Sequence, residues 1–570
     1  MRSSLRRCFG AACAATLAAL IFAANPVRPV FTPQIPSASR AAGNRVFLEK
    51  ADVLYKNEND SFMVVSGKVV FTKGPMIMRC DSAHYYPGIE SFEAFGNVNM
   101  QQGDTLFVYA DELNYEGPNE IAYLYADPGK KVRLINRDVM LQTDIFTYDL
   151  RTDVGYYNVG GVLTDKQNRL ESLEGEYIPS TKDANFYTDV HLNSLSEKDT
   201  LDIFTDSLFY NTATHFAELL SPSRVINARG TIFTDNGFYD TAADTAALYD
   251  RSLVVTPEGR TLCADTIYYR RPAGTALCLG DMILEDSVRS ARLMADYGFF
   301  NQTTDSAYAT GRLLIKEYSR GDTLYLHGRQ LNAYRTFDTI VTPAVPADTL
   351  AGTPEIPASS RVDTMHVADI WPRVRFFRSD MQGICDSMRV TEADSTVRLY
   401  VSPVVWSESR QIFGNLIELH MNDSTIDRAR LPEYGFSSER VVDDFYNQIA
   451  GKEMIAHFED GHMRRLDING NVEIILFPEE NDSTVNKMVQ AESSYLTATF
   501  SGNTTERIKM WPQTIGKATP LFLVRRSMIY LPRFHIYEGL RPLSPADVFV
   551  IPDEMDRLMD AAPRPGQPAD

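Results

Sequence analysis

Aspartate recurs at a regular spacing along this chain, and a carboxylate could hold a metal ion or transfer a proton. The segments GDTLFVYADELNY (103–115), KDTLDIFTDSLFY (198–210) and GRTLCADTIYYRR (259–271) each carry an Asp at their centre. With weaker copies included, the recurring position falls at Asp81, Asp111, Asp144, Gly175, Asp206, Asp235, Asp265, Asp296 and Arg329. Such a ladder of carboxylates could bind calcium or perform acid–base chemistry.

Two observations argue for a structural role of these residues. Calcium-binding β-rolls need Gly-rich turns of the GGxGxD type, and the sequence contains none. A hydrolase needs one special carboxylate pair and not an acid in every repeat. We therefore predict no catalytic residue, no metal ion and no cofactor, and we interpret the Asp as a corner residue whose side chain accepts bonds from nearby backbone N–H groups.

The side chains around the recurring position show why a corner is needed. Apolar or small residues stand three and one before it, as at Val108 and Ala110, and apolar residues stand two and four after it, as at Leu113 and Tyr115. In a straight strand these two sets would face opposite sides, because side chains alternate. A single buried face requires a bulge or sharp bend at the Asp. The Tyr four after it either belongs to the core or lines the mouth of an interior groove.

The spacing of 29 to 33 residues between successive positions indicates stacked supersecondary units. Each unit reads as two short strands with two polar turns, because Val, Ile, Thr, Tyr and Phe alternate with polar residues between Gly, Pro, Asn and Asp. One unit alone could not bury its apolar face, whereas a stack makes a continuous core. Weaker copies follow at Asp386, Asn415, His457 and Glu492. The sequence predicts an all-β protein.

The composition narrows the function and the location. The formal net charge of −19 argues against nucleic acid, because a phosphate-binding protein needs a basic face. Residues 1–24 read as a signal peptide, with Arg2, Arg6 and Arg7 before a short apolar run that ends in small residues. No G-x-x-x-x-G-K-[ST] motif is present, so the sequence offers no P-loop for nucleotide binding. We expect an exported protein.

The remaining chain is predicted to divide into two repeat regions. Repeats occupy 45–335, a Pro/Ala-rich linker or insertion occupies 336–372, a second and more degenerate repeat lobe occupies 373–535, and a tail occupies 536–570. Cys263 and Cys278 flank a turn and could either form a disulfide or be two small core residues.

The iterated segments, each followed by a strand such as GNVNM (96–100), and the opening phrase ADVLYKNENDSFMVVSGKVVFTKG (51–74) resemble the OstA/LptA family of periplasmic lipopolysaccharide-transport proteins. That family is related to the N-terminal region of LptD, and this chain looks like a long variant of the Bacteroidetes type. The resemblance implies an elongated open β-jellyroll, or β-taco, whose apolar trough shields the acyl chains of lipid A.

The resemblance also implies partners and a place in the cell. Lipopolysaccharide would be carried through the periplasm towards the outer membrane, with which the protein could associate. Inner-membrane LptC-like and outer-membrane LptD-like components, or further copies of the chain, would stack edge to edge on free strands. We expect the trough to be lined by Val108, Leu113, Tyr115, Leu141, Phe146, Ile203, Leu208, Ile232, Leu262, Ile267 and Leu293.

Two other functions remain open. A structural β-solenoid or cell-surface interaction protein would have the same repeats around a closed core without a lipid. A carbohydrate-active β-helix enzyme would need an isolated acidic cluster on one face, and the scattered His84, His191, His215 and His327 suggest no such site.

Overall fold

The computed structural model describes residues 45–56, 61–194, 201–318, 321–342, 359–422, 425–459, 462–479, 484–501 and 504–561. The chain divides into two units, Met1–Arg45 and Val46–Asp570, and all that follows concerns the second. The expected signal peptide and the last nine residues lie outside the described residues.

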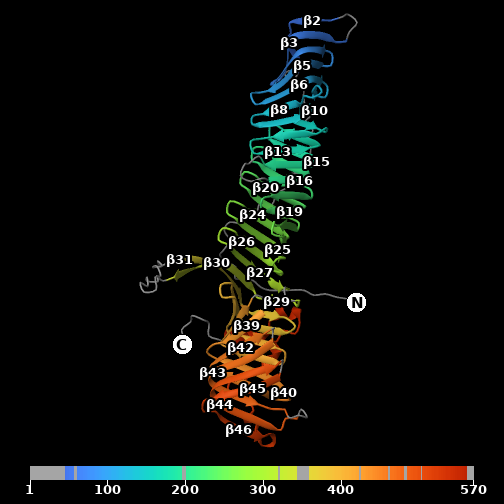
Figure 1. The fold of residues 1–570 in the computed structure, drawn as a ribbon. Helices are drawn as coiled ribbons and strands as arrows, with labels where there is room; N and C mark the ends of the chain where they lie inside the picture. Colours follow the sequence, from blue (N-terminus) through green and yellow to red (C-terminus); the bar gives the residue numbers. More distant parts are fainter. Residues whose placement is uncertain are drawn as a thin grey trace, which may run out of the picture. The chain divides into compact units, whose positions relative to one another are not determined.

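One continuous antiparallel sheet forms this unit, which confirms the all-β prediction, and Figure 1 shows its strands succeeding one another in chain order. Strands β3 to β6 show how it is built. Each pairs with the next, and the register shifts once in every pair, for example between Arg79 and Ser82. Every strand bends at its shift, so the sheet is folded lengthwise into two arms that we call the first and second arm.

Ten long strands belong to both arms: β3 Met63–Lys73, β4 Met76–Tyr86, β5 Ser91–Gln102, β6 Leu106–Glu116, β15 Asp183–Ser194, β16 Leu201–Asn211, β25 Thr275–Asp286, β26 Ala291–Asn301, β43 His462–Leu476 and β44 Lys487–Ser501. The first arm also contains β1 Phe47–Lys50, β8 Val132–Asn136, β9 Val139–Thr143, β12 Gly161–Thr164, β13 Asn168–Ser172, β18 Ser223–Asn227, β19 Gly230–Thr234, β22 Ser252–Val255, β23 Arg260–Ala264, β28 Leu314–Glu317, β29 Leu324–His327, β32 Val374–Phe377, β33 Met381–Cys385, β36 Val404–Ser407, β37 Arg410–Gly414, β40 Gly435–Val442, β41 Phe445–Gly451 and β46 Ile515–Pro520.

The second arm also contains β2 Val53–Tyr55, β7 Ile121–Tyr125, β10 Ile145–Asp149, β11 Val154–Tyr157, β14 Glu174–Ile178, β17 Phe216–Leu219, β20 Asn236–Asp240, β21 Thr245–Tyr249, β24 Thr266–Arg270, β27 Ser306–Thr310, β30 Gln330–Thr342, β31 Ser359–Trp371, β34 Ser387–Thr391, β35 Thr396–Tyr400, β38 Leu416–Asn422, β39 Thr425–Leu431, β42 Glu453–Glu459 and β45 Thr504–Trp511.

The bend reverses the alternation of side chains, as the sequence predicted. In β6, Val108 is buried before the bend and Leu113 and Tyr115 are buried after it, while Asp111 and Glu112 both face outward. The neighbouring strand accommodates the bend with two consecutive residues in the left-handed region, such as Gly96 (φ 76°) and Asn97 (φ 46°) opposite Asp81. The same left-handed pair recurs at 67–68, 188–189, 250–251, 280–281, 311–312, 401–402 and 470–471.

The corner Asp fits this arrangement. Asp111 accepts a bond from the backbone N–H of Asp127 at 2.9 Å, as expected for a corner residue. At other corners the carboxylate contacts the side chain of the left-handed pair, and Asp81 accepts a bond from Asn97 at 2.7 Å. The role of the Asp is therefore to bind the neighbouring strand where both strands turn.

Three corner positions were misplaced by the sequence analysis. The corner lies at Leu173 and not at Gly175, and at Lys452 and not at His457, because these backbone N–H groups donate to the left-handed pair of the next strand. It lies at Ser494 and not at Glu492, since Val472 pairs with Ser493 and Asn469 with Tyr495. The position of the corner is therefore set by the point at which the alternation of buried apolar side chains reverses. It is not set by the type of residue at the corner.

The segment at 336–372, expected to be a Pro/Ala-rich linker or insertion, differs from a plain linker because it begins and ends in strands. Its two flanks pair as β30 and β31 in an antiparallel hairpin from Gln330–Trp371 outward to Thr342–Ser359. Alternating Thr, Val and Ile on both sides of the Pro-rich centre allow this pairing. Residues 343–358 lie outside the described residues.

The expected tail at 536–570 also differs, because residues 521–561 fold onto the outer face of the first arm. This segment contains η1 Leu521–Leu523, η2 Arg526–Met528, η3 Glu538–Leu540, η4 Pro545–Phe549 and α1 Asp553–Asp560. Leu540 and Met555 form a second apolar core with Trp406 and Phe436. No helix in the described ranges is long and apolar enough to cross a membrane.

Arg373 fastens α1 to this core. Its guanidinium pairs with Asp386 at 2.6 Å, with Asp556 at 2.5 Å and with Asp560 at 2.7 Å. Asp386 is a corner residue, so this cluster joins the C-terminal segment to the line along which the sheet is folded.

The four described cysteines are free, and Cys263 and Cys278 lie in different arms. Cys263 pairs across the sheet with Ile283, and Cys278 pairs with Ile267. The interpretation as two unlinked small residues therefore holds, with Cys278 buried and Cys263 partly exposed.

We predict that Gly96→Ala lowers the free energy of unfolding by roughly 1–3 kcal/mol, because Gly96 is left-handed and a Cβ there would lie 2.7 Å from Asp81 Oδ2. Chemical denaturation measures the change. The control is Gly88→Ala, where no atom lies within 4 Å of an added Cβ. Combining Gly96→Ala with Asp81→Ala should recover part of the loss, and full additivity would contradict the assigned contact.

We predict that Arg373→Ala loosens residues 521–561 and destabilises their packing by roughly 1–3 kcal/mol, since Asp386 is nearly buried whereas Asp556 and Asp560 are about half exposed. Limited proteolysis should cut this segment faster. Arg526→Ala is the control, because Arg526 is 85 % exposed beside Asp444. Equal cleavage of the two variants would show that the cluster does not hold the segment.

Candidate functional site

The eleven side chains predicted to line a trough all face the space between the two arms. Nine are buried: Val108, Leu113, Tyr115, Leu141, Phe146, Ile203, Leu208, Ile232 and Ile267. Leu262 and Leu293 are half-buried and pack against the same core. The structure therefore brings these side chains into one continuous apolar interior. Contact of these residues with a lipid stays a prediction.

Tyrosine stands four residues after seven of the corners, and five of these rings are buried between the arms, at 115, 148, 177, 210 and 239. Tyr115 is fully buried, and its hydroxyl accepts a bond of 2.6 Å from Lys73 Nζ, at the end of the first arm. Further bonds of this kind join Tyr85 to Val46 O (3.4 Å), Tyr148 to Gln102 (3.2 Å), Tyr177 to Asn136 (3.0 Å) and Tyr269 to Arg229 (2.8 Å). The burial of Tyr115, Tyr148, Tyr177 and Tyr210 matches the first of the two roles considered for this tyrosine, a place in the core, with the hydroxyl at the edge of that core.

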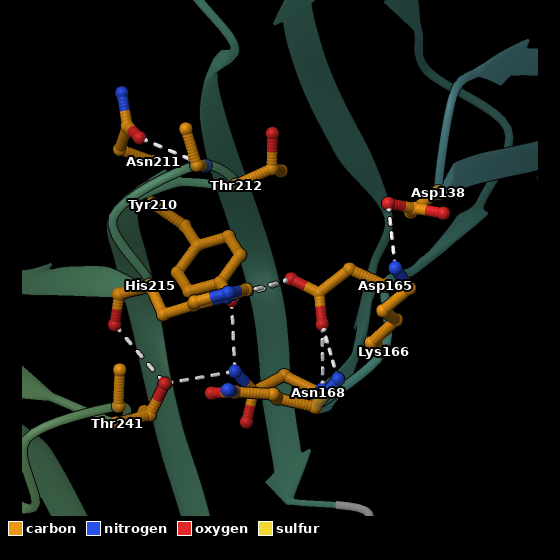
Figure 2. Close-up of polar contacts among 12 residues, drawn as sticks. Asp138, Asp165, Lys166, Asn168, Tyr210, Asn211, Thr212, His215 and Thr241 are labelled. Carbon is orange, nitrogen blue, oxygen red and sulfur yellow. Dashed lines mark hydrogen bonds and ion pairs between the residues drawn. The ribbon is translucent and has the colours of Figure 1, made fainter.

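Figure 2 shows the densest of these contacts, around Tyr210. The Tyr210 hydroxyl donates to Asp165 at 2.6 Å and accepts from Asn168 Nδ2 at 2.8 Å, while His215 lies beside it at 3.0 Å. Asp165 comes from the turn between β12 and β13 in the first arm, and Asn168 is the first residue of β13. Asn168 also bonds Thr241 of the second arm at 2.9 Å. Burial, with a smaller contribution from the Asp165 carboxylate, raises the pKa of Tyr210 well above its usual value. The hydroxyl therefore keeps its proton as a donor.

The neighbours of these tyrosines leave room for the rings. Along the second arm, Tyr148 lies between Ala122 and Gly155, and Tyr210 lies between Ala184 and Ala217. This cross-strand row continues with Tyr177, Tyr239, Ala246, Tyr269 and Ala276. Large and small side chains alternate, so each ring packs over a small neighbour.

The same row changes its composition after the corner at Asp296. The position four after each corner becomes Phe300, Ala333, Val390, Leu419, Ala456 and Ala498. None of these side chains carries a hydroxyl, and most are smaller than tyrosine. The second half of the interior is therefore filled differently from the first.

A cavity of about 280 Å³ lies between the arms in this second half. Its apolar wall combines both arms and consists of Met381, Val405, Ile412, Ile417, Leu419, Ile426, Ala429, Leu431, Met454, Ala456, Phe458, Met463 and Leu466. Asp322, Arg378, Asp380, Ser407, Arg410 and Ser437 complete the lining. Asp322 and Asp380 are exposed, so the cavity reaches the surface at the end of the first arm.

Charged side chains at this opening are held by one another. Arg378 pairs with Asp380 at 2.5 Å, and the Asp322 carboxylate accepts a bond from the Ser379 backbone N–H at 3.0 Å. Arg410 pairs with Glu439 at 3.1 Å and lies over the ring of Phe500, 5.5 Å from its centroid, on the other arm. The site thus joins an apolar chamber to a charged rim.

None of the trough residues predicted from the sequence lines this cavity, because all of them lie between Val108 and Leu293. The signal that could have found it is the loss of tyrosine four after the corner. The arrangement can enclose an apolar chain and leave a polar group at the surface. Within the described ranges, no three His, Cys, Asp or Glu side chains are placed to hold a metal ion.

Comparisons with known proteins place the repeats in a family. The family model described as OstA-like protein matches residues 43–198 and 193–278. None of the curated proteins compared with the chain matches it. Among solved structures, the chain is similar to LptH from Pseudomonas aeruginosa, described as the LptA homologous periplasmic component of the conserved lipopolysaccharide transport device. That likeness has 13 % identity and a TM-score of 0.17 and covers 24 % of this chain and 99 % of LptH. Residues 43–278 of this chain thus match the model of the OstA-like protein family, as its repeated segments indicated.

Proposed function

We propose that this protein is a non-enzymatic lipid carrier of the periplasm, which passes lipopolysaccharide towards the outer membrane and contributes to outer-membrane assembly. The observation that carries the proposal is the apolar cavity with a charged rim between the arms at 378–466. An acyl chain of lipid A would lie in the cavity, and its phosphorylated sugar would meet Arg378 and Arg410 at the opening. The match to the model of the OstA-like family supports the same assignment.

The energetics suit a carrier. Each methylene taken from water into an apolar site contributes about 0.8 kcal/mol, so about ten methylenes would contribute roughly 8 kcal/mol before the cost of ordering the chain. The charged rim adds little affinity, because its ions already pair with one another at the surface. Binding would therefore be reversible, as transfer from one site to the next requires.

Partners would bind at the two ends of the sheet. At the N-terminal end, β1 and β2 pair with β3 on one side only among the described strands, and at the C-terminal end β45 and β46 pair only with β44. Phe47, Val53, Leu54 and Tyr55 are exposed at the first end, and Ile515 is exposed at the other. Such edges accept a further strand, so we propose that LptC-like and LptD-like components, or copies of this chain, pair there.

A structural β-solenoid without cargo is the second candidate. The observation in its favour is the complete burial of Val108, Leu113 and Leu208, which shows that the first half of the interior is packed on itself. Such a protein would bind no lipid, and its cavity would remain empty in the cell.

We predict that a photo-crosslinker placed at Leu419, inside the cavity, forms an adduct with lipopolysaccharide in cells that are making it. Ala456→Trp should weaken this adduct roughly tenfold, since the indole would displace about two methylenes of the chain. Blotting with an antibody against lipopolysaccharide measures both. Ile455→Trp is the matched control, because Ile455 lies on the opposite face of the same strand. Absence of any adduct at Leu419 in the otherwise unchanged protein would favour the β-solenoid.

A further inference from the structure

The tyrosine row adds polar contacts between two arms that are continuous along the fold of the sheet and pack against each other through the apolar interior. Six of the seven hydroxyls of the row bond a residue about forty positions earlier in the chain, at the end of the other arm, for example Lys73 for Tyr115 and Asn136 for Tyr177. Tyr239 instead bonds Asp244 of its own arm. The first-arm partners lie at the strand ends of that arm, as Lys73 and Asn136 do, or in a turn between two of its strands, as Arg229 does. The contacts therefore cross the mouth of the trough at successive levels from Tyr85 to Tyr269.

Several of the partners are buried to an extent unusual for polar side chains, whereas Arg229 is exposed. Lys73 and Asn136 are each 6 % exposed, and Asn168 is fully buried. Buried polar groups are costly unless they are bonded, so each contact favours the closed arrangement of the arms over one in which the groups separate within an apolar interior. The bonds thus stabilise closure beyond what the packing of the rings provides.

Whether the two arms are packed together or enclose a cavity depends on the residue four positions after the corner. Where it is tyrosine, the interior beneath it is packed, as shown by Val108, Ile203 and Leu208, which are all fully buried. Where it is Leu419 or Ala456, the arms enclose the cavity, and both residues line its wall. The change occurs inside one continuous sheet, so the backbone architecture does not account for it.

We propose that the tyrosine row is a latch that holds the first half of the trough shut and so confines an apolar ligand to the second half. Six tyrosines and their first-arm partners then determine where the trough admits the apolar chain of a ligand. They are Tyr85, Tyr115, Tyr148, Tyr177, Tyr210 and Tyr269. Passage through the first half requires these contacts to open in succession, because each tyrosine bonds its own partner. The cargo in this inference rests on the proposed function, whereas the latch itself does not.

The test uses a buried thiol of the first half and needs no lipid. Cys80 faces the interior between the arms, 6 % exposed, and burial raises the pKa of its thiol to about 12, so it reacts only when the arms part. Cys385, fully buried in the second half, is an internal reference in the same molecule. Peptide-resolved mass spectrometry measures the alkylation rate of both thiols in the full chain.

The variant combines Tyr115→Phe, Tyr148→Phe and Tyr177→Phe, which keeps the rings and removes the hydroxyls. Alkylation of Cys80 should rise about fivefold for each lost bond and roughly 100-fold for three, while that of Cys385 stays constant. The control combines Tyr123→Phe, Tyr156→Phe and Tyr268→Phe, which lie on the outer face of the same arm and should change neither rate.

A second variant, Asn136→Leu, removes the partner of Tyr177 from the first arm and should raise the Cys80 rate by about fivefold. Unchanged Cys80 rates in both variants would overturn the latch. So would a parallel rise at Cys80 and Cys385, because the hydroxyls would then stabilise the whole fold and not one half of it. Since no lipid enters the assay, a missing adduct at Leu419 would reject the carrier function and leave this result unaffected.

Discussion

The structure depends on one constraint, namely that a strand must present apolar side chains to the same interior on both sides of a bend. Alternation along a strand forbids this, and the chain resolves the conflict by turning two adjacent residues outward at each corner, as Asp111 and Glu112 do. The neighbouring strand supplies the matching extra length with a left-handed pair. Repetition of this corner about every thirty residues folds one sheet into two facing arms, and every other feature lies between those arms or on their outer faces.

The two arms are joined along the fold of the sheet, and their free edges can lie either close together or apart. The side chains at these free edges decide between the closed and the open arrangement. Tyrosine reaches across from the second arm and bonds polar residues of the first, so that half of the interior is packed. Alanine and leucine at the equivalent positions leave a cavity lined by both arms. The same backbone therefore provides both a closed and a hollow section. On the outer face, residues 521–561 cover the first arm beside the hollow section, where Trp406 and Phe436 need burial.

Much of the architecture could be predicted from the sequence, because the parity of Val108, Leu113 and Tyr115 encodes the corner locally. The left-handed pairs were not predicted, since five of the eight begin with Gly but the others are as different as Thr188–Asp189 and Val401–Ser402, so that no single residue type marks the position. The corners at Leu173 and Lys452 were not predicted for a similar reason, because neither Leu nor Lys is a typical corner residue. The packing of the C-terminal segment depends on distant partners such as Gln411 and Gln448, which bond its backbone only in the folded protein. The repeated motif does not predict the cavity, because the cavity lies between strands in which the motif is weak.

The most direct test of this account is an experimental structure of the protein purified with lipid from cells that make lipopolysaccharide. The account predicts acyl density between the arms beside Leu419 and Met454, a headgroup near Arg378 and Arg410, and no lipid density between Val108 and Leu208. Acyl density between Val108 and Leu208, with the contacts of Tyr115 and Tyr210 intact, would contradict it.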